Sequence, residues 1–289
     1  MVPLLLGGAA LWGLSNMADA EAKTDRANSI NAQAAQIAEN AKRQTERAHG
    51  NMTQTLGRLG RTKMDIMSGN INTVASVMGR IYKNFKINGD SQGLRELEAS
   101  GIDNMFIEEM KALSDQAINI QNTQEFKSSS VGSFCAVGAL GGAVLGLGAI
   151  AAPAMLIYSF MKTDEAEAAL YEAKTRLDEA RYYEERSKNI CALFNAIARR
   201  GEQINNLLVN LNYYFDSAVF QMRNTAINDS YFWKDYPEEY KVNIFYAWQI
   251  AQTVKIIIDT SMIQEDWSIN PDINKPIEMG EQTLGLLSA

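Results

Sequence analysis

Proline and alternating β-type segments are scarce in this chain of 289 residues, and both shortages narrow the range of folds. Only five prolines occur, so the stretches 4–152 and 154–236 contain none. Long helices require such stretches, because proline removes a backbone donor and clashes with the preceding turn. Few segments alternate apolar and polar residues as strands do. The sequence therefore predicts an all-α protein.

Catalytic side chains are equally scarce, because the chain has one histidine and two cysteines. Glu46 and His49 have the spacing of half a di-iron site, but such a site needs a second pair and further inward carboxylates. Residues 146–151 match GxGxxA without the strand that must precede a dinucleotide-binding turn. Cys135 and Cys191 are expected to be buried small apolar residues. We expect no enzyme activity, no catalytic residue, no cofactor and no metal.

The net charge of −7 is unevenly distributed. Nine Lys/Arg residues stand against two acids over residues 42–86, a balance that suits contact with anionic lipid or nucleic acid. Aromatic residues, which stack on bases, are missing from most of this stretch, so nucleic-acid binding is not expected. The alternative is that these charges solvate a long helix. The residues expected to contact an anionic partner are Arg43, Arg47, Arg58, Arg61 and Lys63.

An uncharged run covers residues 131–161, between Lys127 and Lys162. About 20 apolar residues suffice to cross a bilayer as a helix, so we expect a glycine-rich membrane helix. A hairpin is the alternative if Gly141-Gly142 or Pro153 breaks the run, either in the membrane or buried in a soluble form. Small residues at every fourth position let helices pack closely in lipid. The expected packing residues are Gly138, Ala139, Gly142, Ala143 and Gly146.

The N-terminal segment 1–14 is a second apolar stretch, too short to span a bilayer comfortably. Trp12 stands where an aromatic side chain anchors at a membrane interface. Ala18-Asp19-Ala20 resembles a signal-peptidase site, but no Lys or Arg precedes the apolar stretch. We expect a retained, membrane-contacting segment.

Apolar spacing predicts three helices in the rest of the first 224 residues. A long helix over 15–88 has a seam built mostly of alanine, with Gln44 as its polar exception, and ends at the turn signal Asn88-Gly89-Asp90. A shorter amphipathic helix is expected over 92–130, and a long coiled-coil helix over 162–224. Two arrangements fit the two long seams: pairing with each other, or pairing with copies in neighbouring subunits. The expected seam residues of the second long helix are Leu170, Leu177, Phe194, Ile204, Leu208 and Leu211.

The C-terminal region, 225–289, is aromatic and acidic. Pro237 favours a helix over about 237–260, because proline suits the first helical turn. The tail with Pro271 and Pro276 is expected to be irregular. The apolar set expected to dock this helix on the long helices is Val242, Phe245, Tyr246, Gln249, Ile250, Val254, Ile257 and Ile258.

The order of these segments resembles a widespread, uncharacterised group of bacterial helical proteins with a mid-chain glycine-zipper segment. The resemblance rests on NAQAAQIAENAKRQTERA, the glycine-rich stretch, MKTDEAEAALYEAKTRLDEA, YYFDSAVFQ and IIIDTSMI. It implies a bacterial origin and no catalytic residues. The layout is also similar to that of α-helical pore-forming toxins, which combine long bundles with a central apolar hairpin.

These features predict a self-assembling, membrane-associated helical protein that binds a lipid bilayer as a homo-oligomer. It would act as a pore-forming or membrane-disrupting effector in bacterial defence or competition. The alternative is a non-permeabilising scaffold that presents coiled coils and its C-terminal helix to a partner protein. The expected location is the bacterial inner membrane, or solution before transfer to a membrane.

Overall fold

The computed structural model describes residues 7–122, 166–226, 232–264 and 268–288, with backbone alone for 7–20, 166–169 and 225–226. These residues are almost entirely helical and contain one isolated β-bridge, between Ile263 and Ile269. The predicted all-α class is confirmed. The chain divides into two compact units, the first formed by residues 1–50 and 146–195 and the second by residues 51–145 and 196–289.

Two long helices supply residues to both units, namely α1 (Gly7–Ile66) and α7 (Ala166–Ala226). A π-helical turn, η1 (Met67–Ile71), joins α1 to α2 (Asn72–Asn88) without a loop. The helix ends where the sequence signals a turn. Gly89 there has a φ of 71°, and the Asp90 N–H donates to the Phe85 carbonyl at 2.9 Å. This bond across the last turn is typical of a left-handed glycine cap.

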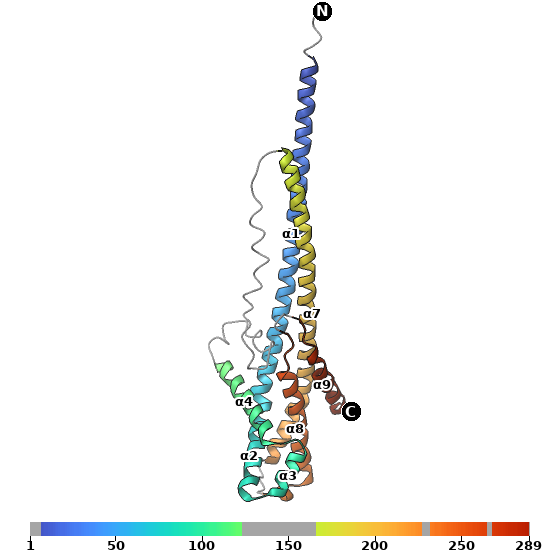
Figure 1. The fold of residues 1–289 in the computed structure, drawn as a ribbon. Helices are drawn as coiled ribbons and strands as arrows, with labels where there is room; N and C mark the ends of the chain where they lie inside the picture. Colours follow the sequence, from blue (N-terminus) through green and yellow to red (C-terminus); the bar gives the residue numbers. More distant parts are fainter. Residues whose placement is uncertain (1–6, 123–165, 227–231, 265–267, 289) are drawn as a thin grey trace, which may run out of the picture. The chain divides into compact units, whose positions relative to one another are not determined.

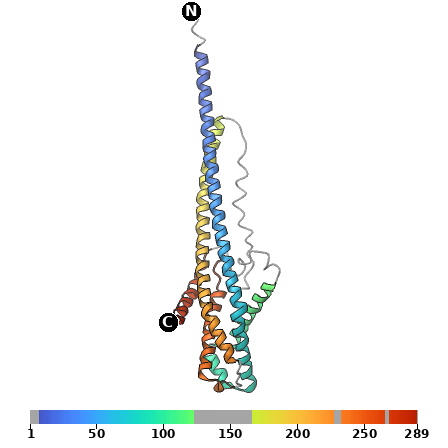
Figure 2. The ribbon, with the colours of Figure 1, turned by 180° about the vertical axis from the view of Figure 1, so that it is seen from behind.

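In the first unit, α1 and α7 lie side by side and run in the same direction (Figures 1 and 2). Thr45 Oγ1 is 3.6 Å from Cys191 Sγ, and one turn further along both helices the rings of His49 and Phe194 pack with centroids 5.5 Å apart. Because the contacting positions advance together on both helices, the pair is parallel. The sequence left the pairing of the two long helices open, and the structure pairs them within one chain.

The second unit contains the later parts of α1 and α7 and all the shorter helices. Here α1, η1 and α7 also contact each other in parallel register: Thr62 Oγ1 donates to Asn205 Oδ1 at 2.8 Å, and Asn70 Nδ2 donates to Asn212 Oδ1 at 2.9 Å. The shorter helix α2 packs against α4, and α8 (Glu238–Asp259) packs against α9. Large buried side chains fill this core, among them Met52, Leu56, Leu59, Met64, Met78, Ile204, Leu208, Phe215, Trp233 and Trp248.

The single helix expected over 92–130 is wrong for its described part, which forms two helices. These are α3 (Ser91–Ala99) and α4 (Asn104–Asn122). Gly101 separates them with a φ of 73°, a backbone conformation that glycine adopts without strain. The Asp103 carboxylate then accepts the Phe106 N–H at 2.7 Å and caps the start of α4.

The irregular tail expected after Asp259 is also wrong, because α9 covers Asn274–Leu287 after the 3₁₀ turn η4 (Pro271–Ile273). The Asn270 side chain accepts the Asp272 N–H at 3.0 Å and caps this turn. Both prolines of the tail fall near helix starts, where no intrahelical N–H is required. Gly280 lets α9 lie close to its neighbours, since a Cβ there would be 2.8 Å from both Ile257 and Leu207 side chains.

The apolar face expected for α8 is confirmed in the second half of the helix, where Ile250, Val254, Ile257 and Ile258 are buried, and is wrong in the first half. Val242 is 61% exposed and Tyr246 is also exposed, whereas the core is reached from neighbouring positions. The helix begins at Glu238, with Pro237 immediately before it. The buried residues are Ile244, Ala247, Trp248, Ile250, Ala251, Thr253, Val254, Lys255, Ile257 and Ile258.

Candidate functional site

The N-terminal end of the parallel pair in the first unit is the candidate functional site. The contact between Thr45 and Cys191 sets a register of 146 residues between the helices. The buried positions follow the same register, with Ala27, Ala34, Ala41 and Ala48 on α1 and Ala173, Ala180, Ser187 and Phe194 on α7. Extended to the first residue of α7, Ala166, this register reaches Ala20 of α1. The helical residues 7–19 of α1 therefore extend beyond the start of α7 (Figure 1).

The seam of this pair is built of small residues and contains buried polar atoms. Asn31 Oδ1 and His49 Nε2 are buried without a hydrogen-bond partner. Gln44, expected in the seam, is exposed, because Thr45 occupies the inward position between Ala41 and Ala48. Small side chains bury little apolar area, and buried polar atoms without partners oppose association. The seam is therefore weakly held.

The residues predicted for the seam of α7 differ in burial between its two ends. Leu170 and Leu177, near the start of the helix, are half-buried. Phe194, the last of them in the first unit, is buried. In the second unit Ile204, Leu208 and Leu211 are fully buried.

The predicted membrane-packing residues lie outside what the structure describes. Gly138, Ala139, Gly142, Ala143 and Gly146 fall in 123–165, and of Trp12 only the helical backbone is described. Among the described helices, none combines the length and hydropathy needed to cross a bilayer.

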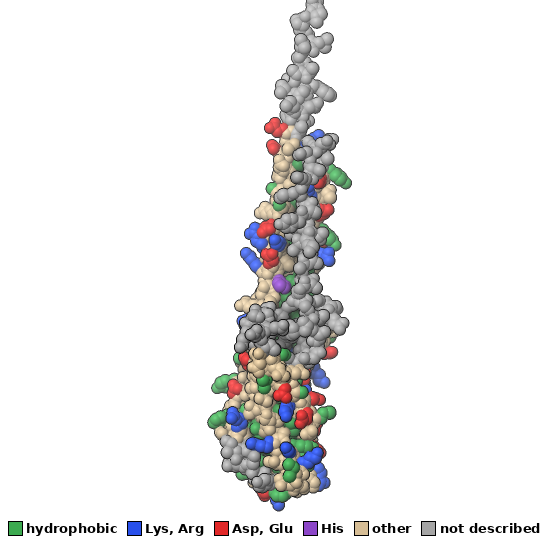
Figure 3. Space-filling model, turned by 90° about the vertical axis from the view of Figure 1, so that its left-hand side faces the viewer, with side chains coloured by type: hydrophobic (Ala, Val, Ile, Leu, Met, Phe, Trp, Pro, Cys, Tyr) green, Lys and Arg blue, Asp and Glu red, His purple; other side chains and the backbone are tan. Residues whose placement is uncertain are grey.

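Four of the basic residues expected to meet an anionic partner are exposed, namely Arg43, Arg47, Arg58 and Arg61, and two of them have an acidic neighbour. Arg43 pairs with Glu39 at 3.0 Å, and Arg58 lies 3.9 Å from Glu202. Figure 3 shows Lys and Arg mixed with Asp and Glu on the face that it draws. The contact with an anionic partner expected for Lys63 is wrong. Only 1% of this residue is exposed, and its ammonium donates to the Ile258 carbonyl at 3.1 Å. This lysine satisfies a carbonyl at the C-terminal end of α8 and cannot reach an outside anion.

A charge network that sequence reasoning missed joins α4 to α8. The Lys255 ammonium lies 2.7 Å from the Asp259 carboxylate, 2.9 Å from that of Glu109, and 4.8 Å from the centre of the Phe106 ring. Burial alone would lower the pKa of Lys255, but the hydrogen bonds and charges of Asp259 and Glu109 outweigh it and raise that pKa. The i, i+4 spacing of Lys255 and Asp259 was visible in the sequence, whereas the partner on α4 was not.

The aromatic residues at the start of the C-terminal region are used inside the second unit. Trp233 and Tyr236 are buried, and both pack near Phe85 with ring centroids 5.9 and 6.1 Å from it. The Asp90 carboxylate accepts the Trp233 N–H at 2.6 Å and the Gly93 N–H at 2.9 Å, and so ties this segment to the start of α3. Trp233 and Tyr236 therefore stabilise the second unit from inside, whereas Phe232 beside them is exposed.

The described residues contain no cluster of His, Cys, Asp or Glu that would hold a metal ion. The described residues define a class: an all-α protein in which one unit contains a parallel pair of helices and the other a packed helical bundle. Comparison with family models, curated proteins and solved structures finds no match to this chain. The predicted relation to bacterial glycine-zipper proteins stays a prediction.

Proposed function

We propose that this chain is a self-assembling, membrane-associated protein that inserts two apolar segments from one end of its parallel helix pair. In this proposal it permeabilises bilayers as an effector in bacterial defence or competition. α1 and α7 would form a coiled-coil stalk, and segments 131–161 of several copies would associate through their glycines.

The observation that carries the proposal is the direction of α7 relative to α1 in the first unit. Each helix begins at the same end of the pair, and each is preceded by an apolar part of the sequence. Of the apolar residues 1–14, residues 1–6 precede α1 in the sequence and residues 7–14 form its first turns. Residues 162–165 alone separate the apolar run 131–161 from the start of α7. Antiparallel helices would have placed the two apolar segments at opposite ends.

The intrachain pairing also favours one membrane topology. A single crossing by 131–161 would put α1 and α7 on opposite sides of the bilayer, where Thr45 could not contact Cys191. A hairpin that enters and leaves from the same side keeps the pair intact. Gly141-Gly142 and Pro153 are the positions where the run can turn.

Release of a dye trapped in lipid vesicles tests the function. The purified chain should release it, and Gly142→Leu should reduce the rate at least about tenfold, because a large side chain prevents close helix packing in lipid. Gly50→Leu is the matched control. Gly50 is an exposed helical glycine of the first unit, and a Cβ there would meet nothing within 4 Å.

Two outcomes would contradict the proposal. One is an intact vesicle population after addition of the parent chain at concentrations where it binds lipid. The other is equal leakage from the parent, Gly142→Leu and Gly50→Leu chains, since packing through the glycines would then have no part in it.

A further inference from the structure

An apolar ridge lies on the face of α7 that points away from the core of the second unit. Val209, Tyr213 and Phe220 form this ridge, and they are 49%, 74% and 65% exposed. Their positions in the sequence place them in one line along the helix, over about 16 Å. Leu208 and Phe215, which are fully buried, lie on the opposite side of α7. Exposed apolar side chains that adjoin one another are typical of interaction surfaces.

Polar residues continue the same exposed face of α7. They are Asn206, Asp216 and Arg223. The Asp216 carboxylate accepts hydrogen bonds from Asn70 Nδ2 at 2.6 Å and from Asn212 Nδ2 at 3.4 Å, so its position is fixed within the second unit. A carboxylate accepts about four hydrogen bonds, which leaves Asp216 able to accept one from outside. The ring of Tyr213 packs edge-on against that of Tyr214, with centroids 5.4 Å apart.

Two copies of this face are complementary when they pack antiparallel about a two-fold axis between residues 214 and 215. The pairs across the axis are Val209 with the partner's Phe220, Tyr213 with the partner's Asp216, and Asn206 with the partner's Arg223. Each pair occurs twice, because a two-fold interface uses the same surface of both subunits. Apolar side chains thus cover each other, and the tyrosine hydroxyl donates to a carboxylate.

The charges on this face oppose a parallel arrangement. A parallel pair in register would place Asp216 against the partner's Asp216 and Arg223 against the partner's Arg223. Like charges that face each other across an interface disfavour association. The antiparallel pair avoids both contacts, so the charge pattern selects its direction.

We propose that the outer face of α7 from Asn206 to Arg223 binds the same face of a second copy, antiparallel, and forms a dimer in solution. The six ridge side chains would bury on the order of 700 Å² of apolar surface. That is more than half of the roughly 1,200 Å² that specific interfaces bury, and the flanking polar positions supply the rest. The dimer is therefore weak, with a Kd of roughly 10–100 µM, and dissociates in dilute solution.

This dimer forms through the second unit and needs no lipid, so it is independent of the proposed membrane insertion. Sedimentation equilibrium of the full chain in lipid-free buffer, from about 1 to 300 µM, measures its Kd. Gly142→Leu should leave the Kd unchanged. Loss of the dimer in Gly142→Leu would assign the association to the apolar run 131–161 and overturn the proposal.

Phe220→Asp should raise the Kd at least about tenfold, because it places a charge against the partner's Val209. Tyr182→Asp is the matched control. Tyr182 is an exposed aromatic residue of α7 outside the ridge, and its replacement should leave the Kd unchanged. Val209→Asp replaces Phe220→Asp if that variant fails to reach the helix content of the parent.

Crosslinking tests the direction of the pair. Asn206→Cys and Arg223→Cys chains, each with Cys135→Ala and Cys191→Ser, are mixed and treated with a short bifunctional maleimide. The mixture should give a crosslink between positions 206 and 223, and neither chain should crosslink to itself.

A designed ion pair tests the same contact by a gain of affinity. Asn206→Asp faces the partner's Arg223 twice in the dimer, so it should lower the Kd about threefold, and Arg223→Gln should remove this gain. A parent chain that is monomeric at the highest concentration, an equal Kd for Phe220→Asp and Tyr182→Asp, or crosslinks between like positions would each overturn the proposal.

Discussion

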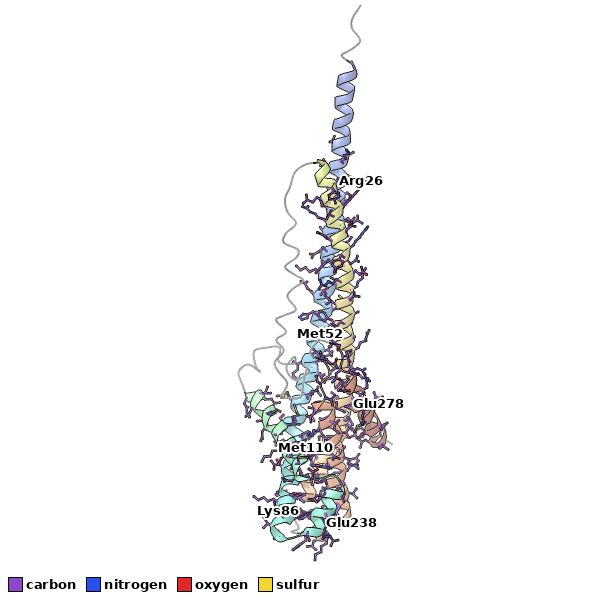
Figure 4. All side chains as sticks on the ribbon, viewed as in Figure 1. Arg26, Met52, Lys86, Met110, Glu238 and Glu278 are labelled. Atoms are coloured by element: carbon purple, nitrogen blue, oxygen red, sulfur yellow. The ribbon has the colours of Figure 1, made fainter. Side chains whose placement is uncertain are left out.

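The two units pair the same long helices with side chains of very different size. In the first unit the seam of α1 is Ala27, Ala34, Ala41 and Ala48, whereas from Met52 onward, labelled in Figure 4, it is built of methionine, leucine and isoleucine. A fully buried large apolar side chain contributes about 1.5–3 kcal/mol, several times the contribution of an alanine methyl. Most of the free energy of folding therefore resides in the second unit. The first unit is the part that opens at low cost.

This difference suits the proposed function. In the proposed function the second unit would stay folded while the weakly held helix pair of the first unit separates. The first unit contains residues 1–14 and the part of the 131–161 run that leads into α7. The following predictions, from the largest expected effect to the smallest, test whether the two units differ as described.

Truncation of a core side chain in the second unit should have the largest effect. Phe215 is fully buried, so Phe215→Ala should lower the free energy of unfolding by about 3–5 kcal/mol. Denaturant titrations followed by tryptophan fluorescence measure this, since Trp233 and Trp248 are both buried in the same unit. Phe220→Ala is the control on the same helix, because Phe220 is 65% exposed and should change stability by less than about 0.5 kcal/mol. Equal effects of the two variants would contradict the described core.

Loss of the Asp90 side chain should have the next largest effect. It removes two hydrogen bonds, one that caps α3 and one to the Trp233 N–H, so Asp90→Ala should cost about 1–3 kcal/mol. The same titrations apply, with Asp115→Ala on the exposed face of α4 as control. A variant as stable as the parent would show that the contact to Trp233 contributes nothing.

The contribution of Lys255 should depend on pH in a direction fixed by its neighbours. Because its folded pKa is raised by Asp259 and Glu109 in spite of burial, its stabilising effect is complete below the unfolded pKa, about 10.4. The effect disappears as pH rises through the folded pKa. The stability gap between the parent and Lys255→Met should be constant from pH 7 to about 9.5 and shrink above about 10.5. As a control, the difference in free energy of unfolding between the parent and Lys111→Met should be near zero at every pH, because Lys111 is exposed. A difference for Lys255→Met that grows with pH would contradict a raised pKa of Lys255.

The smallest effect is expected in the seam of the first unit. Ala34→Gly and Ala35→Gly lose the same helix propensity, about 1 kcal/mol, but only Ala34 is buried. The free energy of opening of α1, measured by hydrogen exchange of its amides, should therefore differ by no more than about 1 kcal/mol between the two variants. A loss at Ala34 as large as that for Phe215→Ala would make the two units equally well packed.

The helical class and the main helix ends followed from residues whose effects are local. The scarcity of proline allowed long helices, and Asn88-Gly89-Asp90 is a turn that needs no tertiary contact. The tail was misread for the same reason, because its two prolines suggested irregular structure although Asn270 caps a helix start there. A proline or a capping residue shows that a helix boundary is near. It does not show whether a helix ends before it or begins after it.

The remaining errors concern contacts between distant parts of the chain. Lys63 looks like any surface lysine in the sequence, and its burial depends on the end of α8, 195 residues away. The inward face of α8 could not be chosen from its own residues, since apolar side chains surround most of the helix. The parallel pairing of α1 and α7 was likewise not decidable, because a heptad-like seam specifies neither its partner nor its direction.

The most direct test of the proposed insertion compares four positions labelled with an environment-sensitive fluorophore in the presence of vesicles. Single cysteines replace Trp12 and Ala143 in the two apolar segments, and Val209 and Leu286 in the second unit, in a background without native thiols. Val209 and Leu286 are demanding controls, because they are apolar and 49% and 82% exposed. Emission should shift to shorter wavelength at 12 and 143 and stay unchanged at 209 and 286. No shift at 143, or an equal shift at all four positions, would contradict insertion from the N-terminal end of the helix pair.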